Sequence, residues 1–300
     1  MANPKLALIP SGYKATEVYS VLPNDGTADF AFARTGEATR VRKDGLIETV
    51  ATTVPRLDWL NSNCPNLLLE VQSTNVHTYS ESSTGKGLTG ATLTDNQEVS
   101  PSGEYNAMLL KEDTSTGKHR FNTNTFSVTS SSTYTLSMFV KKNSESRFIF
   151  INAGALLGVS GSFKLETQAV TGSVKIINNY GNDWYRIGIT GTASSTQSGV
   201  IYIQMQEGII DEAYTGDESS VFVWGLQFEQ SAGAENLATS YIPNLATGST
   251  TRQSETCSVT TPSGVSQIVE TFSDNTTNTI TTIPTTYNVS NGRIKKVIMT

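Results

Sequence analysis

The feature of this chain that most constrains its fold is a series of short segments in which apolar and polar residues alternate. In residues 133–141, Tyr134, Leu136, Met138 and Val140 fall on one face of an extended strand, and the residues between them fall on the other. Similar segments follow, with turn residues between them, at 147–152, 162–166, 173–178, 184–190, 199–206 and 220–230. No window between them shows a helical stripe. About eight short strands at this spacing predict an all-β fold, a jelly-roll β-sandwich.

The composition agrees with an all-β protein whose surface is polar but weakly charged. Charged residues make up only 16% of the chain, so Ser, Thr, Asn, Gln and Gly must cover much of the surface. The net charge of −6 and the lack of a Lys/Arg stripe argue against nucleic-acid binding. The one basic cluster, Arg293, Lys295 and Lys296, is predicted to protect a strand edge from unwanted pairing.

Cys64 and Cys257 have no metal-site spacing and are predicted to be free thiols, although one disulfide between them is also conceivable. The apolar run 6–9 is cut by Pro10, so it does not resemble a secretion signal. No segment has the length of a membrane span. We therefore expect synthesis in a cytoplasm without membrane insertion.

The pattern divides the chain into three expected regions. They are an N-terminal arm with a β-rich docking region (1–75), the β-sandwich (76–243) and a Thr/Ser-rich segment ending in a β-hairpin (244–300). The arm, 2–21, is expected to have little core of its own and to dock on a partner chain.

Three local signals support this division. Residues 39–50 predict a hairpin around the turn 43–45, and 67–69 predict a strand buried on both faces. Asn291-Gly292 predicts the C-terminal hairpin, which must pack on another element because an isolated hairpin is marginally stable. Whether 244–282 is ordered without partners stays open.

Residues that could carry catalysis form no recognisable motif, and we expect no cofactor, no metal and no enzymatic activity. His77 and His119 lie near no nucleophile motif and are predicted to be surface residues. The acidic loop 211–218 could ligate calcium but lacks the spacing of a calcium loop, so a solvated turn is the better interpretation. Carboxylates that could form a hydrolase pair, also without a motif, are Asp183, Glu207, Asp211, Glu212, Asp217 and Glu229.

Aromatic residues are the remaining candidates for ligand binding, because sugar rings stack on flat aromatic faces. The candidates are Trp184, Tyr180 and Tyr202. For Trp184, packing between strands is an equally good interpretation. Trp224 is predicted to be a core residue, because alternation places it on one face with Phe222, Leu226 and Phe228.

One long ordered motif carries a resemblance to a known family. The segments FARTGEATRVRKDGLIETVATTVPRLDW (32–59) and CPNLLLEVQSTN (64–75) resemble a segment of many tailed-bacteriophage virion proteins. A proline that usually follows LLLE in that family is Val71 here. Shorter matching pieces are 134–141, 184–186, 221–229, 239–243 and 251–252. The resemblance covers about residues 1–252.

This resemblance implies a jelly roll similar to carbohydrate-binding modules, in a head fibre, spike or tail fibre attached to capsid or tail. It also implies a homotrimer that contacts other virion proteins, is assembled in the host cytoplasm and could bind host-surface polysaccharide. A tryptophan that often follows TYSE in the family is missing here, which puts a sugar site at that place in doubt. Residues of the signature expected to have structural roles are Arg34, Arg40, Arg56, Trp59 and Glu70.

Two alternatives remain open. The first is a capsid decoration or collar protein without a ligand, which should bury its aromatic residues. The second is a tail protein that degrades polysaccharide, which requires paired carboxylates in a groove.

Overall fold

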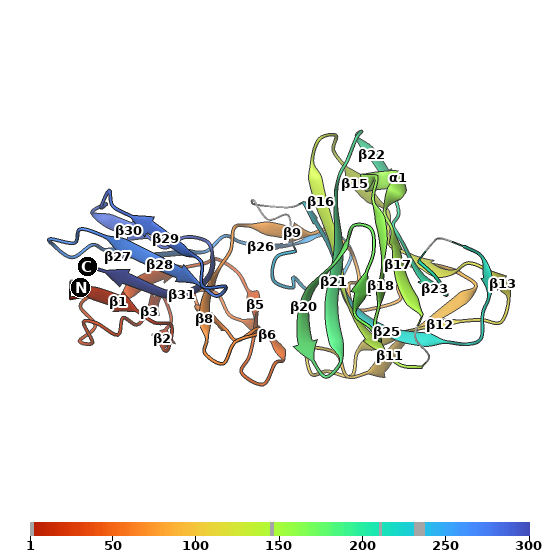
Figure 1. The fold of residues 1–300 in the computed structure, drawn as a ribbon, viewed down its shortest axis with the longest axis horizontal. Helices are drawn as coiled ribbons and strands as arrows, with labels where there is room; N and C mark the ends of the chain where they lie inside the picture. The colour runs from red at the N-terminus through yellow and green to blue at the C-terminus, as the bar shows by residue number, and fades with distance from the viewer. Residues whose placement is uncertain (1–2, 145–146, 210–211, 231–237) are drawn as a thin grey trace. The chain divides into compact units, whose positions relative to one another are not determined.

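The computed structural model describes residues 3–144, 147–209, 212–230 and 238–300. Apart from one α-helical turn, α1 (Gly154–Leu157), the regular elements of these residues are all β-strands (Figure 1). The predicted all-β class is confirmed. In the described residues no helix is long and apolar enough to cross a bilayer.

The chain forms two compact units. Residues 1–72 and 252–300 form the terminal unit, and residues 73–251 form the central unit. The sequence division into three regions differs from this arrangement, because it kept the N-terminal and C-terminal segments apart.

The central unit is built on two antiparallel sheets of six strands each. Sheet I has the order β10 (Gly87–Thr89), β14 (His119–Asn122), β23 (Tyr202–Gln206), β17 (Phe148–Asn152), β18 (Ser160–Lys164), β19 (Ala169–Val170). Sheet II has the order β11 (Ala91–Glu98), β12 (Ala107–Glu112), β25 (Ser220–Gln230), β16 (Thr133–Lys142), β21 (Trp184–Thr192), β20 (Val174–Gly181). Three small sheets pair β13 (Thr116–Gly117) with β24 (Tyr214–Thr215), β15 (Phe126–Val128) with β22 (Gln197–Gly199), and β9 (Ser73–Asn75) with β26 (Thr250–Arg252).

The predicted alternation of β16 is confirmed by the core of the central unit. Leu136, Met138 and Val140 are buried in one apolar cluster with residues of β17 such as Ile149 and Ile151. The residues that alternate with them lie on the opposite faces of their strands. Each sheet therefore has an inner face on the core and an outer face, and the outer faces hold the candidate ligand-binding residues.

The predicted face of Trp224 is wrong, although its predicted burial is confirmed. Ser137 lies opposite Gln227 but Phe139 lies opposite Trp224, so β25 contains one extra residue, and Gly225 there has φ +63°. Such a β-bulge reverses the alternation beyond it. Leu226 consequently faces the core, whereas Trp224 packs on the outer face of sheet II against Phe139, with ring centroids 5.1 Å apart.

The terminal unit contains two larger sheets and a hairpin. One sheet has the order β29 (Thr277–Ile280), β28 (Ile268–Phe272), β31 (Gly292–Met299), β8 (Asn66–Leu69), β7 (Arg56–Asp58), with β1 (Leu6–Leu8) also on β31. The other has the order β2 (Tyr13–Lys14), β3 (Glu17–Val18), β4 (Phe30–Ala33), β27 (Thr256–Thr260), β30 (Thr286–Asn288). The predicted hairpin is confirmed as β5 (Ala38–Val41) and β6 (Ile47–Val50), with Gly45 at φ +87° in its turn.

The prediction that the N-terminal arm has little core of its own is wrong. Leu6 and Leu8 are fully buried in the apolar core of the terminal unit, so the N-terminal arm contributes to a core within its own chain. The order of the Thr/Ser-rich segment 244–282 was left open by the sequence; this segment contains β26 of the central unit and β27, β28 and β29 of the terminal unit.

The prediction of a C-terminal hairpin is also wrong, because β30 and β31 do not pair with each other: β30 pairs with β27, and β31 pairs with β28, β8 and β1. Asn291-Gly292 therefore connects two sheets. Lys295 and Lys296 are exposed on β31, which has neighbours along both edges, so this basic cluster does not protect a sheet edge.

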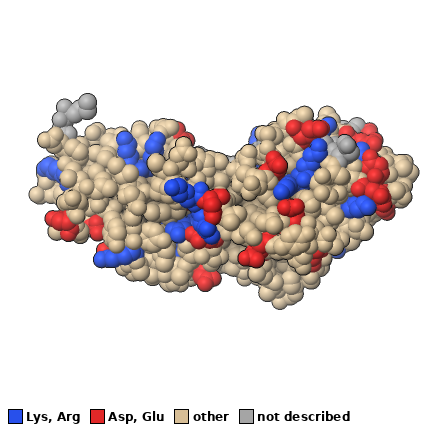
Figure 2. Space-filling model, turned by 90° about the horizontal axis from the view of Figure 1, so that it is seen from below, with Lys and Arg blue, Asp and Glu red and all other residues tan. Residues whose placement is uncertain are grey.

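The two cysteines are free thiols, as predicted, with Cys64 exposed and Cys257 buried. In the view of Figure 2, uncharged residues cover most of the visible surface. Lys and Arg groups lie beside Asp and Glu groups there, and no continuous basic stripe is visible. This agrees with the low charged fraction of the chain.

Candidate functional site

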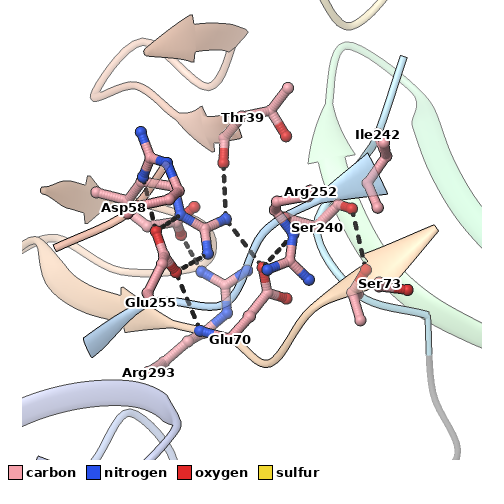
Figure 3. Close-up of polar contacts among 12 residues, drawn as sticks. Thr39, Asp58, Glu70, Ser73, Ser240, Ile242, Arg252, Glu255 and Arg293 are labelled. Atoms are coloured by element: carbon pink, nitrogen blue, oxygen red, sulfur yellow. Dashed lines mark hydrogen bonds and ion pairs between the residues drawn. The ribbon is translucent and has the colours of Figure 1, made fainter. Parts of the chain in front are cut away.

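Arg34 and Arg56 of the signature motif form ion pairs with Glu255, a residue from the other end of the chain that Figure 3 labels. Nη1 of Arg34 and Nε of Arg56 each lie 2.7 Å from Oε1 of Glu255, and Nη2 of Arg56 contacts Oε2 of the same residue. All three side chains are completely buried. Glu255 immediately precedes β27, so it joins the N-terminal and C-terminal segments of the terminal unit.

Glu70 extends this buried group. Nη1 of Arg56 lies 2.9 Å from Oε2 of Glu70, and Nε of Arg252 lies 3.5 Å from the same oxygen. Burial by itself would lower the pKa of Arg56, but the charges of Glu70 and Glu255 outweigh it, so the pKa is raised. Three arginines and two glutamates together form the signature cluster: Arg34, Arg56, Arg252, Glu70 and Glu255.

Backbone carbonyls satisfy the remaining donors of Arg34 and Arg56. Nε of Arg34 donates to the carbonyl of Gly36 at 3.0 Å and its Nη2 to that of Ala51 at 2.7 Å. Nη1 of Arg56 donates to the carbonyl of Thr39 at 3.0 Å. Breaking such a buried, fully bonded ion pair is strongly destabilising, because one charge would be left without a partner. These contacts support a structural role.

Arg40 and Trp59 lie outside this cluster. Nε of Arg40 lies 2.7 Å from Oε1 of Glu48 across the β5–β6 hairpin, and its Nη1 donates to the hydroxyl of Tyr13 at 3.2 Å. The ammonium of Lys43 lies 5.6 Å from the ring centroid of Trp59. Both residues are partly exposed, so each should contribute less to stability than Arg56.

Of the three aromatic candidates, Trp184 offers no free face. Its side chain is only 3% exposed, and its Nε1 donates to the carbonyl of Val99 at 3.0 Å. Tyr180 is half-buried and packs edge-on against Phe139, with centroids 4.9 Å apart. Trp184 and Tyr180 come from β21 and β20 of sheet II, whereas Tyr202 comes from β23 of sheet I. The structure therefore does not bring the three together.

The histidines are buried, so the prediction that they lie on the surface is wrong. Both side chains have 0% exposure. The ring of His77 packs 5.6 Å from that of Phe126, and burial lowers the pKa of His77 to about 3. Nδ1 of His119 lies 2.5 Å from the carbonyl oxygen of Gly90. Each ring is thus part of the interior of the central unit.

The carboxylates considered for hydrolysis are engaged elsewhere or lie apart. Glu229 is buried and accepts hydrogen bonds from the hydroxyl of Ser73, the amide of Gln227, and the backbone N–H and hydroxyl of Thr239. Glu207 and Asp217 both pair with Arg147, at 3.1 and 2.9 Å. Asp183 and Glu212 are exposed, and Asp211 lies outside the described residues. Among the described residues, no group of three or more His, Cys, Asp or Glu side chains could hold a metal ion.

The outer face of sheet I is the strongest candidate site. Phe121, Ile203, Ile149 and Phe163 from its four central strands point into the core. The residues that alternate with them form three rows across the sheet, defined by the strand register. The tyrosine row is Asn122, Tyr202, Asn152 and Ser160; the middle row is Arg120, Gln204, Phe150 and Ser162; the lysine row is Gln206, Phe148 and Lys164.

The tyrosine row is the most accessible part of this face. Asn122, Tyr202 and Asn152 are half-exposed and Ser160 is exposed. The Arg120 guanidinium lies 4.0 Å from the centroid of the Tyr202 ring, and its Nη1 donates to Oε1 of Gln204 at 3.0 Å. Arg120 therefore fixes the tyrosine ring from the neighbouring row, so the ring does not have to be ordered by a ligand.

The rest of the face is more covered. Gln204, Phe150 and Ser162 of the middle row are buried. The hydroxyl of Ser162 donates to the carbonyl of Ile209 at 3.4 Å, and the backbone N–H of Glu212 donates to Oε1 of Gln206 at 3.4 Å. Backbone that follows β23 thus lies against part of the middle and lysine rows. The open surface includes the tyrosine row together with Phe148 and Lys164, which are half-exposed.

Of the residues on this face, only Tyr202 is predicted from the sequence as a candidate for ligand binding. Arg120, Asn122, Phe148 and Asn152 were missed because their strands are short and adjoin no motif. In β17, FIFIN, apolar residues occupy both faces, so alternation alone could not show which phenylalanines lie outside. Opposed amides and a tyrosine on neighbouring strands become visible only when the strand register is known.

No protein-family model and no curated protein matches this chain. Among solved structures, it resembles the carbohydrate-binding and catalytic modules of Clostridium thermocellum endo-1,4-β-D-xylanase 10B complexed with xylohexaose, at 13% identity and TM-score 0.34, over 57% of this chain and 30% of that one. It also resembles the enzymatically active domain of bacteriophage CBA120 tailspike protein 4, at 12% identity and TM-score 0.30, over 51% of this chain and 21% of that one.

A third solved structure is described as a carbohydrate-binding module from the β-sandwich superfamily. It shares 11% identity at TM-score 0.30, over 75% of this chain and 84% of that one. The chain spans less than a third of the length of the first two proteins.

Proposed function

We propose that this chain is a non-enzymatic fibre or spike protein of a tailed-bacteriophage virion whose central unit binds glycans on the outer face of sheet I. The observation that carries the binding function is the tyrosine row. A half-exposed tyrosine lies between Asn122 and Asn152 on the two adjacent strands. Sugars present apolar ring faces that stack on aromatic rings, and hydroxyl groups that bond to side-chain amides.

The contrast between the two sheets supports binding over a purely architectural role. On the outer face of sheet II, Phe139 and Trp224 are buried against each other and against Tyr241 of the following loop, and the half-buried Tyr180 packs edge-on against Phe139. On sheet I, Tyr202 and Phe148 keep exposed surface. A decoration protein without a ligand has no need of half-exposed aromatics beside amides on one face.

The virion role is supported by the ordered motif of residues 32–75. In this proposal the terminal unit attaches the chain to capsid or tail proteins, the chain is a homotrimer, and it is assembled in the host cytoplasm. A shallow, half-exposed face should bind each glycan weakly, and many copies on one virion would convert weak binding into avidity. Cryo-EM of intact virions would test the location, and absence of the chain from the particle would refute it.

The binding function is tested with the full chain on immobilised host-surface polysaccharides. Tyr202→Ala should weaken binding roughly twofold to thirteenfold, since an aromatic contact contributes about 0.5–1.5 kcal/mol. Tyr105→Ala is the matched control, because Tyr105 is an exposed tyrosine of the same unit far from β23 in sequence. Equal binding by wild type and Tyr202→Ala would refute the assignment of this face.

A further inference from the structure

The six strands of sheet I contain no Asp or Glu, although the chain has 27 acidic residues and a net charge of −6. These strands contain one arginine and one lysine. Both residues, Arg120 and Lys164, lie on the outer face. Sheet II, in contrast, mixes both signs of charge: its strands carry Asp95, Glu98, Glu112 and Glu229 together with five Lys and Arg residues. The strands of the candidate face therefore carry only positive charges, although the protein is acidic. The segment that follows β23 carries Glu207, which pairs with Arg147, and Glu212, whose backbone lies beside Gln206 of the lysine row.

Neither cation has a carboxylate partner among the described residues. Nη1 of Arg120 binds Gln204, whereas its Nη2 has no hydrogen-bond partner in the described part of the chain. Nζ of Lys164 lies 5.0 Å from the ring centroid of Phe148 and forms no ion pair with any described residue. Other basic residues of the central unit do pair with acids, namely Lys111, Lys141, Lys142 and Arg147.

The two cations are separated across the sheet. Arg120 is on β14 and Lys164 on β18, with β23 and β17 between them. Three strand spacings amount to roughly 14 Å. Neutral amides and aromatics, such as Gln204 and Phe148, lie between them. An extended chain with repeated negative groups could contact both cations and cross the neutral surface, whereas a small anion could reach only one.

We propose that the ligand of this face is an acidic polysaccharide, whose repeated carboxylate or ester-sulfate groups bind Arg120 and Lys164. This inference rests on the proposed glycan-binding function and names the class of glycan. An Arg guanidinium can bind a carboxylate or sulfate with two parallel hydrogen bonds, and a Lys ammonium acts as a point charge. Both contacts lie at the surface, so added salt should weaken them.

The test compares binding of the full-length protein to alginate, a polyuronate, to dextran sulfate, and to neutral dextran. Each is measured at about 0.02 M and about 0.5 M salt, where the screening length changes several-fold. We expect at least tenfold tighter binding to one of the acidic polymers than to neutral dextran at low salt, and a large loss at high salt. The polymer preferred identifies carboxylate or sulfate as the recognised group.

Substitutions of single residues test whether the acidic polymers bind at Arg120 and Lys164. Arg120→Gln and Lys164→Gln should each weaken acidic binding several-fold and reduce its salt dependence, and Arg120→Lys should retain part of it. Lys175→Gln is the matched control, because Lys175 is an exposed lysine on β20 of sheet II. Lys164→Gln keeps the test decisive even if loss of Arg120 disturbs the packing of Gln204, because Lys164 makes no hydrogen bond to a described residue.

The outcomes separate the two proposals. Equal, salt-insensitive binding to acidic and neutral polymers would refute the acidic ligand and leave the glycan-binding face intact, provided that Tyr202→Ala still weakens it. Salt-sensitive binding that neither Arg120→Gln nor Lys164→Gln changes would also refute it, since the polymer would then bind elsewhere. No binding to any host polysaccharide or test polymer would refute the glycan-binding function itself.

Discussion

Nε of Arg56 donates a hydrogen bond of 2.7 Å to Oε1 of Glu255, a residue 199 positions further along the chain. Both side chains are fully buried, and Arg34 binds the same carboxylate. This contact joins a strand of the N-terminal segment to the beginning of β27. The terminal unit therefore depends on both ends of the chain.

Arg56→Ala should destabilise the terminal unit by roughly 3–5 kcal/mol, because it leaves the buried Glu255 and the half-buried Glu70 with too few partners. Native-state hydrogen exchange of amides in β7, β8 and β27 measures this locally. Arg42→Ala is the control, since Arg42 forms an exposed pair with Asp44 and should change stability by less than about 0.5 kcal/mol. Similar protection in the two variants would contradict a structural role for Arg56.

Arg40→Ala should have a smaller effect, about 1 kcal/mol, because its pair with Glu48 is partly exposed to solvent. We expect unchanged glycan binding by the assembled protein. Urea unfolding and polysaccharide binding measured on one preparation check both statements. If the variant kept its stability but lost glycan binding, Arg40 would be a residue that contacts the ligand and not one that stabilises the fold.

Stability of the central unit should fall as the pH is lowered from 7 toward 3. Burial, assisted by the positive charge of Lys86, holds the pKa of His77 at about 3, against 6.5 for the ordinary residue. The unfolded chain therefore binds the proton first, and the contribution of neutral His77 is complete above pH 6.5 and lost as the pH falls toward 3.

At pH 5 this loss amounts to roughly 2 kcal/mol, at about 1.4 kcal/mol per pKa unit. His77→Gln removes the titration while keeping a polar side chain. The free energy of unfolding, measured in urea at pH 7 and at pH 5, should therefore differ less between the two pH values for this variant than for wild type. An unchanged difference would mean that other groups cause the acid sensitivity.

The two thiols should react at very different rates. Burial raises the pKa of Cys257 to about 12, so almost none of its thiolate exists near neutral pH, and its side chain is inaccessible. Cys64 is exposed. A thiol reagent should modify only Cys64 in the native protein and both residues in urea. Cys64→Ser, which should abolish the native reaction, is the control.

Gly225→Ala should destabilise the central unit by roughly 1–3 kcal/mol, because the residue has φ +63° and a Cβ atom there would lie 2.9 Å from the Phe139 ring. Gly208→Ala is the control, since a Cβ at Gly208 meets nothing within 4 Å. Urea unfolding followed by tryptophan fluorescence measures the difference. Equal stability of the two variants would show that the bulge tolerates a side chain.

Much of the fold could be predicted because the period-two pattern of each strand is a local property. The alternation in β16 identified Leu136, Met138 and Val140 as core residues, and the turn at Gly45 identified the β5–β6 hairpin. The same locality explains the failures. Asn291-Gly292 has the local sequence of a hairpin turn, but the strands on either side of it, β30 and β31, pair with strands of two different sheets.

The candidate site was less predictable, because it depends on register between strands distant in sequence. Trp184 and Tyr202 look equally suitable in the sequence, yet one is buried against Val99 and the other is half-exposed beside Asn122 and Asn152. A single extra residue at Gly225 was enough to place Trp224 and Leu226, which alternation predicts on one face, on opposite faces of sheet II. Such a bulge leaves only a lone glycine in a strand as its sequence signal.

The sequence by itself determined the all-β class and the local hairpin predicted over residues 39–50, since each follows from composition or from neighbouring residues. Only the tertiary structure decided that both ends of the chain form one unit around Arg56 and Glu255, and that sheet I carries the open face. The physical reason is that a buried charge needs a partner and a strand needs a neighbour, and either can come from any part of the chain.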